Sequence, residues 1–385
     1  MKIVHICMVD AFSEGWAYHR NIISDKNKAD GHDVTIITTK YRMRSDGKCE
    51  LDKPGVFYTK TGVKIVRLEN IVSGLPMAVM DRLHWTKGLY KALEQEKPDI
   101  IMVHNLQFVN LYLVAKYRKK HNDMRLIGDT HSDRFVSIGK NPKKSIFVNK
   151  RIWGPVIRRN FKQFDRFCYI GLEQKQFFEE MYNISLENAM LAPLPAPIVS
   201  EKDKEKARDK IRKKHDIKQD EKLFVHSGKL VPRKKTKELL IALRQIPLKC
   251  KLLIIGDIPP ESMKELNALI DKDRRVEYLG WKSGDELREY ISAADLYLQP
   301  GTMSITMQNA LCAGTPVMIY PHDSYKYYCN GCEFIVKTTE DIERVFKGLS
   351  ENGYDLNDMS RKAYEVANQY FSIDNAAKIL YEVFE

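Results

Sequence analysis

Short apolar runs alternate with amphipathic helical segments along almost the whole of this 385-residue chain. The run Lys2 to Met8 precedes a helical segment at Tyr18 to Lys28, and the same order returns after the runs Ile100 to His104 and Leu252 to Ile255. Apolar strands separated by helices are typical of parallel sheets with helices on both faces. The alternation therefore predicts an α/β chain of doubly wound, Rossmann-like sheets.

The length suits two domains, each large enough for a core of its own. The segment Leu194 to Ser200 interrupts the alternation with two prolines, which disfavour helix and suit an extended connector. We therefore predict a first domain over 1–197 and a second over 198–375. The tail from Ser360 is amphipathic and is expected to be helical.

In the second domain, the strand Leu223 to Val225 runs into a glycine turn at Gly228, followed by a loop that carries Lys229 and Lys234. A helix start offers free backbone N–H groups and the positive end of a dipole, and so binds anions. The two lysines add full charge. A diphosphate is the expected ligand.

A second unit of this kind follows strand Leu296 to Leu298, where Pro300–Gly301 opens a loop rich in hydroxyl groups and then a helix. Its hydroxyls, on Thr302, Ser304 and Thr306, can donate to the same anion. Open parallel sheets bind ligands beyond the carboxyl ends of their strands, so both loops should face one crevice.

These residues resemble glycosyltransferase family 4, the retaining, nucleotide-sugar-dependent enzymes of the GT-B architecture. The family's G-R-L-x-x-x-K-G segment is similar to Gly228–Lys229–Leu230 with Lys234–Lys235. Its P-S…E-x7-E-A…G-x-P-V segment is similar to Pro300, Asn309–Ala310 and Gly314–Thr315–Pro316–Val317. Similar residues also occur at Gly31–His32–Asp33–Val34, Pro98–Asp99–Ile100–Ile101, His131 and Gly280–Trp281, so the resemblance covers nearly the whole chain.

The resemblance implies two Rossmann-like domains facing a cleft, with the C-terminal helix, 376–385, crossing back onto the first domain. It implies sugar transfer from a nucleoside-diphosphate-sugar, with UDP-sugar as the first choice. His131, Lys229 and Lys234 are then the expected catalytic residues. The expected donor-binding residues are Gly15, Gly228, Gly256, Trp281, Lys282, Thr302, Ser304, Ile305, Thr306 and Asn309.

The chain departs from the family pattern where the family carries its two glutamates. Asn309 stands in place of the second, and ungapped spacing puts Gly301 in place of the first. Lys229 replaces an arginine and loses its bidentate geometry. No paired-aspartate motif follows a strand where a metal-dependent transferase would need one, so we expect no metal and no other cofactor.

Three segments of the first domain are candidates for the donor and acceptor side. Asp129 to Asp133 follows a strand; Asp133 could orient the His131 ring or contact acceptor hydroxyls, and Asp129 and Asp133 could equally cap the next helix. Gly15 and Trp16 lie in the loop after the first strand, and His104 ends another strand. We expect acceptor contacts at Trp16, His104 and Asp133. For Trp16 and Trp281, core packing is the alternative.

The net charge of +12 suits an anionic partner. Lys143 to Lys162 places basic residues among large apolar ones, which fits either an anionic membrane surface or a core helix with a solvated basic face. No nucleic-acid module is recognisable. Seven scattered cysteines, with no signal peptide or membrane span visible, suggest a cytoplasmic protein, peripheral on the inner membrane face if the basic segment docks.

The predicted function is transfer of a sugar to a glycan or polyprenyl-diphosphate-linked acceptor, as in bacterial surface polysaccharide synthesis. Two alternatives remain at this stage. A GT-B nucleotide-sugar epimerase would share the diphosphate site and turn over a UDP-sugar without acceptor. A degenerate scaffold subunit would explain the missing glutamates at Gly301 and Asn309.

Overall fold

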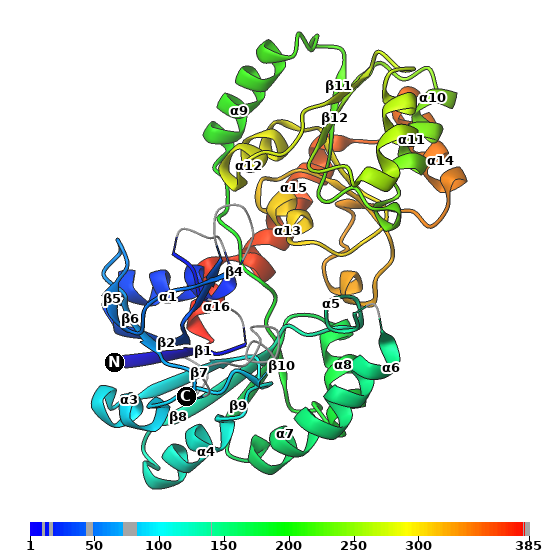
Figure 1. Ribbon diagram of the computed structural model, residues 1–385. Helices are drawn as coiled ribbons and strands as arrows, with labels where there is room; N and C mark the ends of the chain where they lie inside the picture. The colour runs from blue at the N-terminus through cyan, green and yellow to red at the C-terminus, as the bar shows by residue number, and fades with distance from the viewer. Residues whose placement is uncertain are drawn as a thin grey trace. The chain divides into compact units, whose positions relative to one another are not determined.

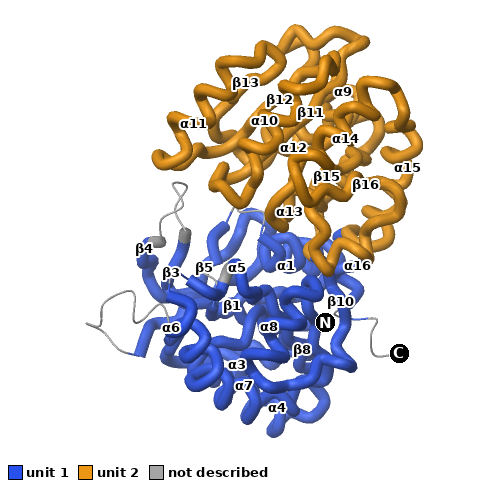
Figure 2. Tube along the Cα trace, turned by 90° about the vertical axis from the view of Figure 1, so that its right-hand side faces the viewer, with its two compact units in different colours: residues 1–193, 373–385 blue, residues 194–372 orange. Residues whose placement is uncertain are grey.

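The computed structural model describes residues 1–9, 12–14, 18–43, 49–71, 83–139, 141–379 and 381. The chain forms two compact units (Figure 2). Unit 1 comprises Met1–Pro193 together with Ile373–Glu385, and unit 2 comprises Leu194–Ser372. The boundaries expected from the sequence, after residues 197 and 375, each lie a few residues beyond the points where the chain passes between the two units.

The sheet of unit 1 has the strand order β10-β9-β8-β7-β1-β2-β6-β5, and every neighbouring pair is parallel except β5 with β6. The antiparallel edge strand β5 precedes β6 in the sequence and pairs with it at the edge of the sheet. A separate antiparallel hairpin pairs β3 with β4. The strands are β1 (Lys2–Cys7), β2 (Asp33–Thr39), β3 (Tyr41–Met43), β4 (Cys49–Leu51), β5 (Gly55–Tyr58), β6 (Lys64–Leu68), β7 (Ile100–His104), β8 (Arg125–Thr130), β9 (Arg166–Tyr169) and β10 (Met190–Leu191).

Helices of unit 1 follow its strands in chain order (Figure 1). The helix α3 begins at Leu89, directly after Gly88, whose φ is 85°. The other described helices are α1 (His19–Ala29), α4 (Leu111–Lys120), α5 (Arg134–Ser137), α6 (Pro142–Phe147), a π-helical turn (Val148–Trp153), α7 (Gly154–Phe161), α8 (Leu172–Tyr182) and α16 (Ile373–Lys378); α3 ends at Glu96.

The C-terminal segment returns to unit 1, as the GT-B architecture implies. The helix α16 lies beside α1 in Figure 1, and Lys26 Nζ is 2.7 Å from Asp374 Oδ1. Ala376, Ile379 and Tyr381 pack against a small core that contains Ile3 and other strand residues. The return of this segment therefore rests on apolar burial and an ion pair.

Unit 2 has a six-stranded parallel sheet with the order β13-β12-β11-β14-β15-β16. Its strands are β11 (Lys222–Ser227), β12 (Cys250–Ile255), β13 (Val276–Tyr278), β14 (Leu296–Gln299), β15 (Val317–Ile319) and β16 (Glu333–Ile335). Its helical segments are α9 (Glu201–Lys214), the 3₁₀ turn Pro232–Lys234, α10 (Thr236–Gln245), α11 (Pro260–Ile270), α12 (Gly284–Ala293), α13 (Ile305–Cys312), the 3₁₀ turn Asp323–Tyr327, α14 (Thr339–Ser350), α15 (Leu356–Val366) and the π-helical turn Ala367–Phe371.

Two apolar clusters of unit 2 contain alternate residues of the same strands. In β11, Val225 belongs to one cluster and Phe224 to the other, and both side chains are fully buried. Side chains of a strand point alternately to the two faces of its sheet, so helices cover both faces. Within the described residues, no helix has the length and apolar character that crossing a bilayer requires.

Candidate active site

The turn after β11 places a lysine directly against a glycine backbone. Gly228 has a φ of 128°, and a Cβ added there would lie 2.8 Å from Lys234 Cε and 2.9 Å from Lys234 Nζ. Only glycine therefore leaves room for the Lys234 side chain at the carboxyl end of β11. This edge of a parallel sheet is where such folds bind ligands.

Lys234 is the buried cation of this turn, with only 7% of its surface exposed. Burial, with a smaller contribution from the charge of Arg233, lowers the pKa of Lys234 to about 8. A cation that is short of solvent in the free protein interacts strongly with an anion that enters the turn. Lys229, the other predicted cation, is exposed and does not share this burial.

Two further glycines allow neighbouring loops to approach this turn. A Cβ on Gly256, whose φ is 130°, would lie 1.9 Å from the carbonyl oxygen of Gly228. A Cβ on Gly301 would lie 2.0 Å from the carbonyl oxygen of Arg233. The loops after β11, β12 and β14 therefore meet through bare backbone, which leaves peptide groups close to Lys234.

The start of α13 is organised by a buried hydroxyl network. The Thr306 hydroxyl lies 2.7 Å from the Tyr297 hydroxyl, 2.9 Å from Gln299 Oε1 and 2.9 Å from Ser304 Oγ. Gln299 Nε2 in turn donates to the Thr302 carbonyl at 2.8 Å. Thr306 is 8% exposed, so its hydroxyl shapes the loop from inside and does not face a ligand as the sequence suggested. Ser304 caps the helix through its hydroxyl.

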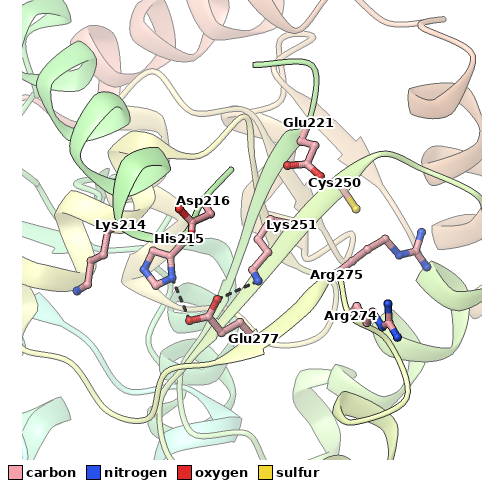
Figure 3. Close-up of a pocket in the computed structure, with 9 residues that line it drawn as sticks. All are labelled: Lys214, His215, Asp216, Glu221, Cys250, Lys251, Arg274, Arg275 and Glu277. Atoms are coloured by element: carbon pink, nitrogen blue, oxygen red, sulfur yellow. Dashed lines mark hydrogen bonds and ion pairs between the residues drawn. The ribbon is translucent and has the colours of Figure 1, made fainter. Parts of the chain in front are cut away.

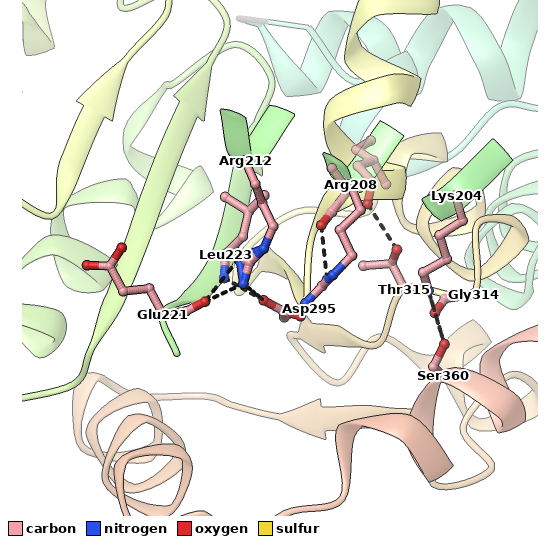
Figure 4. A network of polar contacts seen from close by, with 11 residues as sticks. Lys204, Arg208, Arg212, Glu221, Leu223, Asp295, Gly314, Thr315 and Ser360 are labelled. Atoms are coloured by element: carbon pink, nitrogen blue, oxygen red, sulfur yellow. Dashed lines mark hydrogen bonds and ion pairs between the residues drawn. The ribbon is translucent and has the colours of Figure 1, made fainter. Parts of the chain in front are cut away.

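The turn after α13 is clamped from α9 and α15 (Figure 4). Lys204 Nζ and Ser360 Oγ both donate to the Gly314 carbonyl, and the Thr315 hydroxyl donates to the Ile291 carbonyl at 2.9 Å. Gly314, with a φ of 59°, also packs against the Tyr364 ring, which a Cβ would approach to 2.2 Å. The Gly-Thr-Pro motif thus has a structural role in joining α13 to β15.

The remaining predicted donor residues lie at the surface or partly exposed. Trp281 is 65% exposed, which rules out its alternative as a core residue. Lys282 is partly buried just before the capping box of α12. Ile305 and Asn309 of α13 are also partly buried. These positions leave their side chains available to a ligand without the burial that marks Lys234.

Unit 2 also has a pocket of about 490 Å³ at the opposite end of its sheet (Figure 3). Its polar groups already pair with each other: Glu277 is 3.0 Å from His215 Nδ1 and 3.0 Å from Lys251 Nζ. Cys250 begins β12, so this pocket lies at the amino ends of the strands. The Lys234 turn, at the carboxyl ends of the strands, is the candidate ligand site of unit 2.

Unit 1 brings polar side chains together at the carboxyl ends of β7 and β8. His104 and Asp129 are paired in register, and His104 Nδ1 is 2.9 Å from Asp129 Oδ2. His131 Nε2 is 3.1 Å from the same oxygen, and the Asn105 amide donates to Asp129 Oδ1 at 3.0 Å. Asn105 Oδ1 accepts from the His131 amide at 2.9 Å. The His131 ring, 21% exposed, is thereby fixed at the strand ends.

Asp129, not Asp133, holds the imidazole of His131. Burial would raise the pKa of Asp129, but the adjacent His131 and His104 lower it well below its usual range, so the side chain is a carboxylate. Asp133 accepts from the Phe135 amide at 2.7 Å and from Gln174 Nε2 at 2.8 Å. The helix-capping alternative is thus confirmed for Asp133 and wrong for Asp129.

His104, an expected acceptor contact, is buried behind Asp129. Its ring is 2% exposed and stands between Asp129 and His5, with its Nε2 3.1 Å from His5 Nδ1. Burial lowers the pKa of His5 to about 3, so His5 is neutral. Sequence reasoning missed His5 and His19, because strand order decides which strand ends meet. The predicted site residues Gly15 and Trp16 lie outside the described residues.

Residues 207–366 match the family model described as Glycosyl transferases group 1. Comparison with curated protein sequences finds no match. Among solved structures, Anabaena HepE in complex with UDP is 15% identical, with a TM-score of 0.69 over 100% of this chain and 99% of that one. WaaG, a glycosyltransferase involved in lipopolysaccharide biosynthesis, is 18% identical, with a TM-score of 0.64 over 98% and 99%.

Sucrose-phosphate synthase from Thermosynechococcus elongatus is 14% identical, with a TM-score of 0.67 over 99% of this chain and 98% of that one. At such identities the structural likeness shows the fold, which matches GT-B proteins along the full length. The family model covers the region that contains the Lys234 turn and the start of α13. The protein therefore has the GT-B fold, and residues 207–366, most of unit 2, match the Glycosyl transferases group 1 model.

Proposed function

We propose that the protein transfers a sugar from a nucleoside-diphosphate-sugar, with UDP as the nucleotide, to a glycan or lipid-linked glycan acceptor, with retention at the anomeric carbon. HepE was solved with UDP, with UDP and glucose, and with UDP-glucose, which supports this choice of donor. WaaG is involved in lipopolysaccharide biosynthesis, which supports a role in surface polysaccharide assembly.

The observation that carries the proposal is the buried Lys234 ammonium against the Gly228 backbone. In the transfer, the bond between the anomeric carbon and the diphosphate oxygen breaks, and negative charge grows on the departing diphosphate. Lys234 stabilises that charge together with Lys229 and the backbone groups at the start of α13. Fixed cationic side chains take the part that a divalent ion plays in other transferases, so the transfer step needs no metal.

His131 supplies the donor-sugar contact on the side of unit 1. Asp129 Oδ2 lies 3.1 Å from His131 Nε2, and this ion-pair contact limits how the ring can turn. The acceptor hydroxyl attacks the anomeric carbon, takes the glycosyl group and passes its proton to the departing diphosphate oxygen. His131 acts here by orienting the sugar.

Diphosphate binding should be coupled to proton uptake at alkaline pH. The free protein holds the pKa of Lys234 at about 8, and a bound anion favours the ammonium, so binding raises that pKa. At pH 8 we expect uptake of about half a proton per UDP, and affinity should fall roughly tenfold from pH 7 to pH 9. Calorimetry in buffers of different ionisation enthalpy measures the uptake.

Lys234→Ala is the control for this measurement, because it removes the titrating ammonium and leaves the other cations of the turn in place. When UDP binds this variant at pH 8, the proton uptake seen with the wild type should be absent. Wild-type protein that binds UDP at pH 8 with no proton uptake would show that the diphosphate does not contact Lys234.

We further propose that the segment Pro142 to Phe161 docks on an anionic membrane surface. Trp153 and Ile157 pack into the core of unit 1, which confirms a core-facing side, while the other side carries exposed basic residues. Phe147 and Ile152 on that side are 60% and 44% exposed. Apolar side chains beside basic ones suit the interface of an anionic bilayer.

Neutralising Lys150, Arg151 and Arg159 together as glutamine should weaken co-sedimentation with phosphatidylserine vesicles by roughly a hundredfold, since each charge contributes about 1 kcal/mol. Arg158 is left intact because it donates to the Tyr182 carbonyl. The matched control removes three exposed lysines of α9, namely Lys202, Lys206 and Lys213. Equal losses in both triple variants would refute docking through this segment.

A further inference from the structure

A hydrogen-bond chain in unit 1 starts at the carboxylate of Asp30. The Tyr381 hydroxyl donates to Asp30 Oδ2 at 2.8 Å, and Asn27 Nδ2 donates to that hydroxyl at 3.0 Å. These contacts fix the Asn27 amide with its Oδ1 toward His5. If the amide were flipped, its oxygen would also need the single proton of the Tyr381 hydroxyl, and that proton could not reach both Asn27 and Asp30. His5 Nε2 lies 3.0 Å from Asn27 Oδ1 and must be the protonated nitrogen of His5.

The protonation of His5 in turn fixes the ring of His104. A His5 ring that carries one proton, on Nε2, has a lone pair on Nδ1, and His104 Nε2 lies 3.1 Å from that atom. His104 must therefore donate from Nε2. Its Nδ1 then carries a lone pair, which points at Asp129 Oδ2 from 2.9 Å. Two lone pairs that face each other at this distance require a cation, either a proton or a metal ion, between or beside them.

Other nitrogens converge on the same oxygen. His131 Nε2 is 3.1 Å and His19 Nδ1 is 3.9 Å from Asp129 Oδ2. One nitrogen or oxygen from each of the four side chains lies within 4.8 Å of the others. His19 Nδ1 is buried and has no hydrogen-bond partner among the described residues. A proton shared by His104 and Asp129 would leave this nitrogen unsatisfied, whereas a metal ion satisfies every one of these groups.

We propose that His19, His104, Asp129 and His131 form a Zn²⁺-binding site. Zinc takes four nitrogen or oxygen ligands at about 2.0 Å in a tetrahedron, whose edges are about 3.3 Å. The three separations from Asp129 Oδ2, at 2.9, 3.1 and 3.9 Å, lie around that value.

The groups behind the ligands also fit zinc. Ligating histidines usually donate their second ring N–H to an acceptor, as His104 does to His5, and ligating carboxylates are themselves hydrogen-bonded, as Asp129 is by the Asn105 amide. The proposal is independent of the transfer reaction. It has one consequence for that reaction: zinc on His131 would withdraw the ring from the donor sugar, so the ion would act as an inhibitor and not as a cofactor.

The test is a titration of Zn²⁺ into EDTA-stripped, dialysed protein, in competition with a chromophoric chelator. We expect one tightly bound ion per chain. His19→Asn should weaken binding at least tenfold, and His5→Gln, which removes a group behind a ligand, by about 10- to 100-fold. His121→Asn, a histidine of unit 1 that pairs with Glu94 and lies outside the cluster, should bind as the wild type does.

The double variant Cys329→Ser, Cys332→Ser tests whether these thiols hold the zinc ion. We expect it to bind zinc as the wild type does. Burial raises the pKa of both thiols to about 12, which makes them poor ligands at neutral pH. Cobalt(II) bound to wild-type protein should give a tetrahedral d–d spectrum with no thiolate charge-transfer band, a readout that needs no variant.

Three results would each overturn the proposal. The wild-type protein could fail to bind one Zn²⁺ per chain, the cobalt spectrum could show a thiolate band, or folded His19→Asn could bind Zn²⁺ as tightly as the wild type. The cation between His104 and Asp129 would then be a proton. Because this titration contains no nucleotide, its failure leaves the proposed transfer reaction standing, and failure of nucleotide binding leaves the zinc site standing.

Discussion

Lys234→Ala should lower kcat for sugar transfer by about 100- to 1000-fold, because it removes a buried cation that faces the charge developing on the leaving diphosphate. The variant should remain folded. At pH 7 the protonated Lys234 destabilises the folded protein, because burial has lowered its pKa to about 8, below the usual lysine value. This loss of folding free energy is recovered only as the pH rises from about 8 toward the usual lysine pKa. Loss of the charge therefore offsets loss of the packed alkyl chain.

Lys249→Ala is the matched control, because Lys249 stands just before β12 at the opposite end of the same sheet and its ammonium pairs with Asp220 at 2.8 Å. Its transfer rate should equal that of the wild type. Steady-state kinetics and thermal unfolding of both variants separate catalysis from folding. A Lys234→Ala enzyme that is folded and retains more than a tenth of wild-type kcat would remove the diphosphate assignment.

Gly301→Ala should disrupt the donor site and destabilise unit 2. The new Cβ would lie 2.0 Å from the Arg233 carbonyl oxygen, which is backbone and cannot turn aside, so the loop carrying Lys234 must move. Overpacking of this kind raises the free energy of the folded state by about 3 kcal/mol, which lowers the Tm by roughly 10 °C for a domain of this size. Differential scanning calorimetry and UDP titration check the two effects.

Gly284→Ala is the control for this change, since a Cβ there meets nothing within 4 Å and the residue opens α12. It should leave both Tm and UDP affinity unchanged. The same contact explains why the family's first glutamate cannot simply stand at position 301, and Gly301→Glu should be no more active than Gly301→Ala. A Gly301→Ala protein with wild-type Tm and affinity would refute the close loop packing.

The fold could be predicted from the sequence because its signals are local. Strands such as Lys2–Cys7 and Cys250–Ile255 are continuous apolar runs, and helices fill the intervals between them. The Gly228 turn, its two lysines and the Ser304 helix start were also readable, because glycine and capping residues act within a few positions of where they stand.

The burial of individual side chains and the order of the strands in the sheets could not be predicted in the same way. Lys229 and Lys234 are alike in sequence, yet one is exposed and the other buried, because the loop around Gly301 covers only the second. The histidine cluster is assembled from β1, β7, β8 and α1, so it depends on which strands are neighbours. Strand order brings His104 of β7 and His5 of β1 to Asp129, whereas His131 follows Asp129 by two residues in the same segment.

The most direct test of the account is the thermal stability of the wild-type protein and of Lys234→Ala with UDP, GDP, ADP and TDP, each in the presence of EDTA. The account predicts that UDP, at about 100 times its dissociation constant, stabilises the wild type by roughly 2.7 kcal/mol, and that Lys234→Ala, which binds UDP more weakly, is stabilised much less at the same UDP concentration. Wild-type protein that no nucleoside diphosphate stabilises, or that UDP stabilises equally in both proteins, would contradict it.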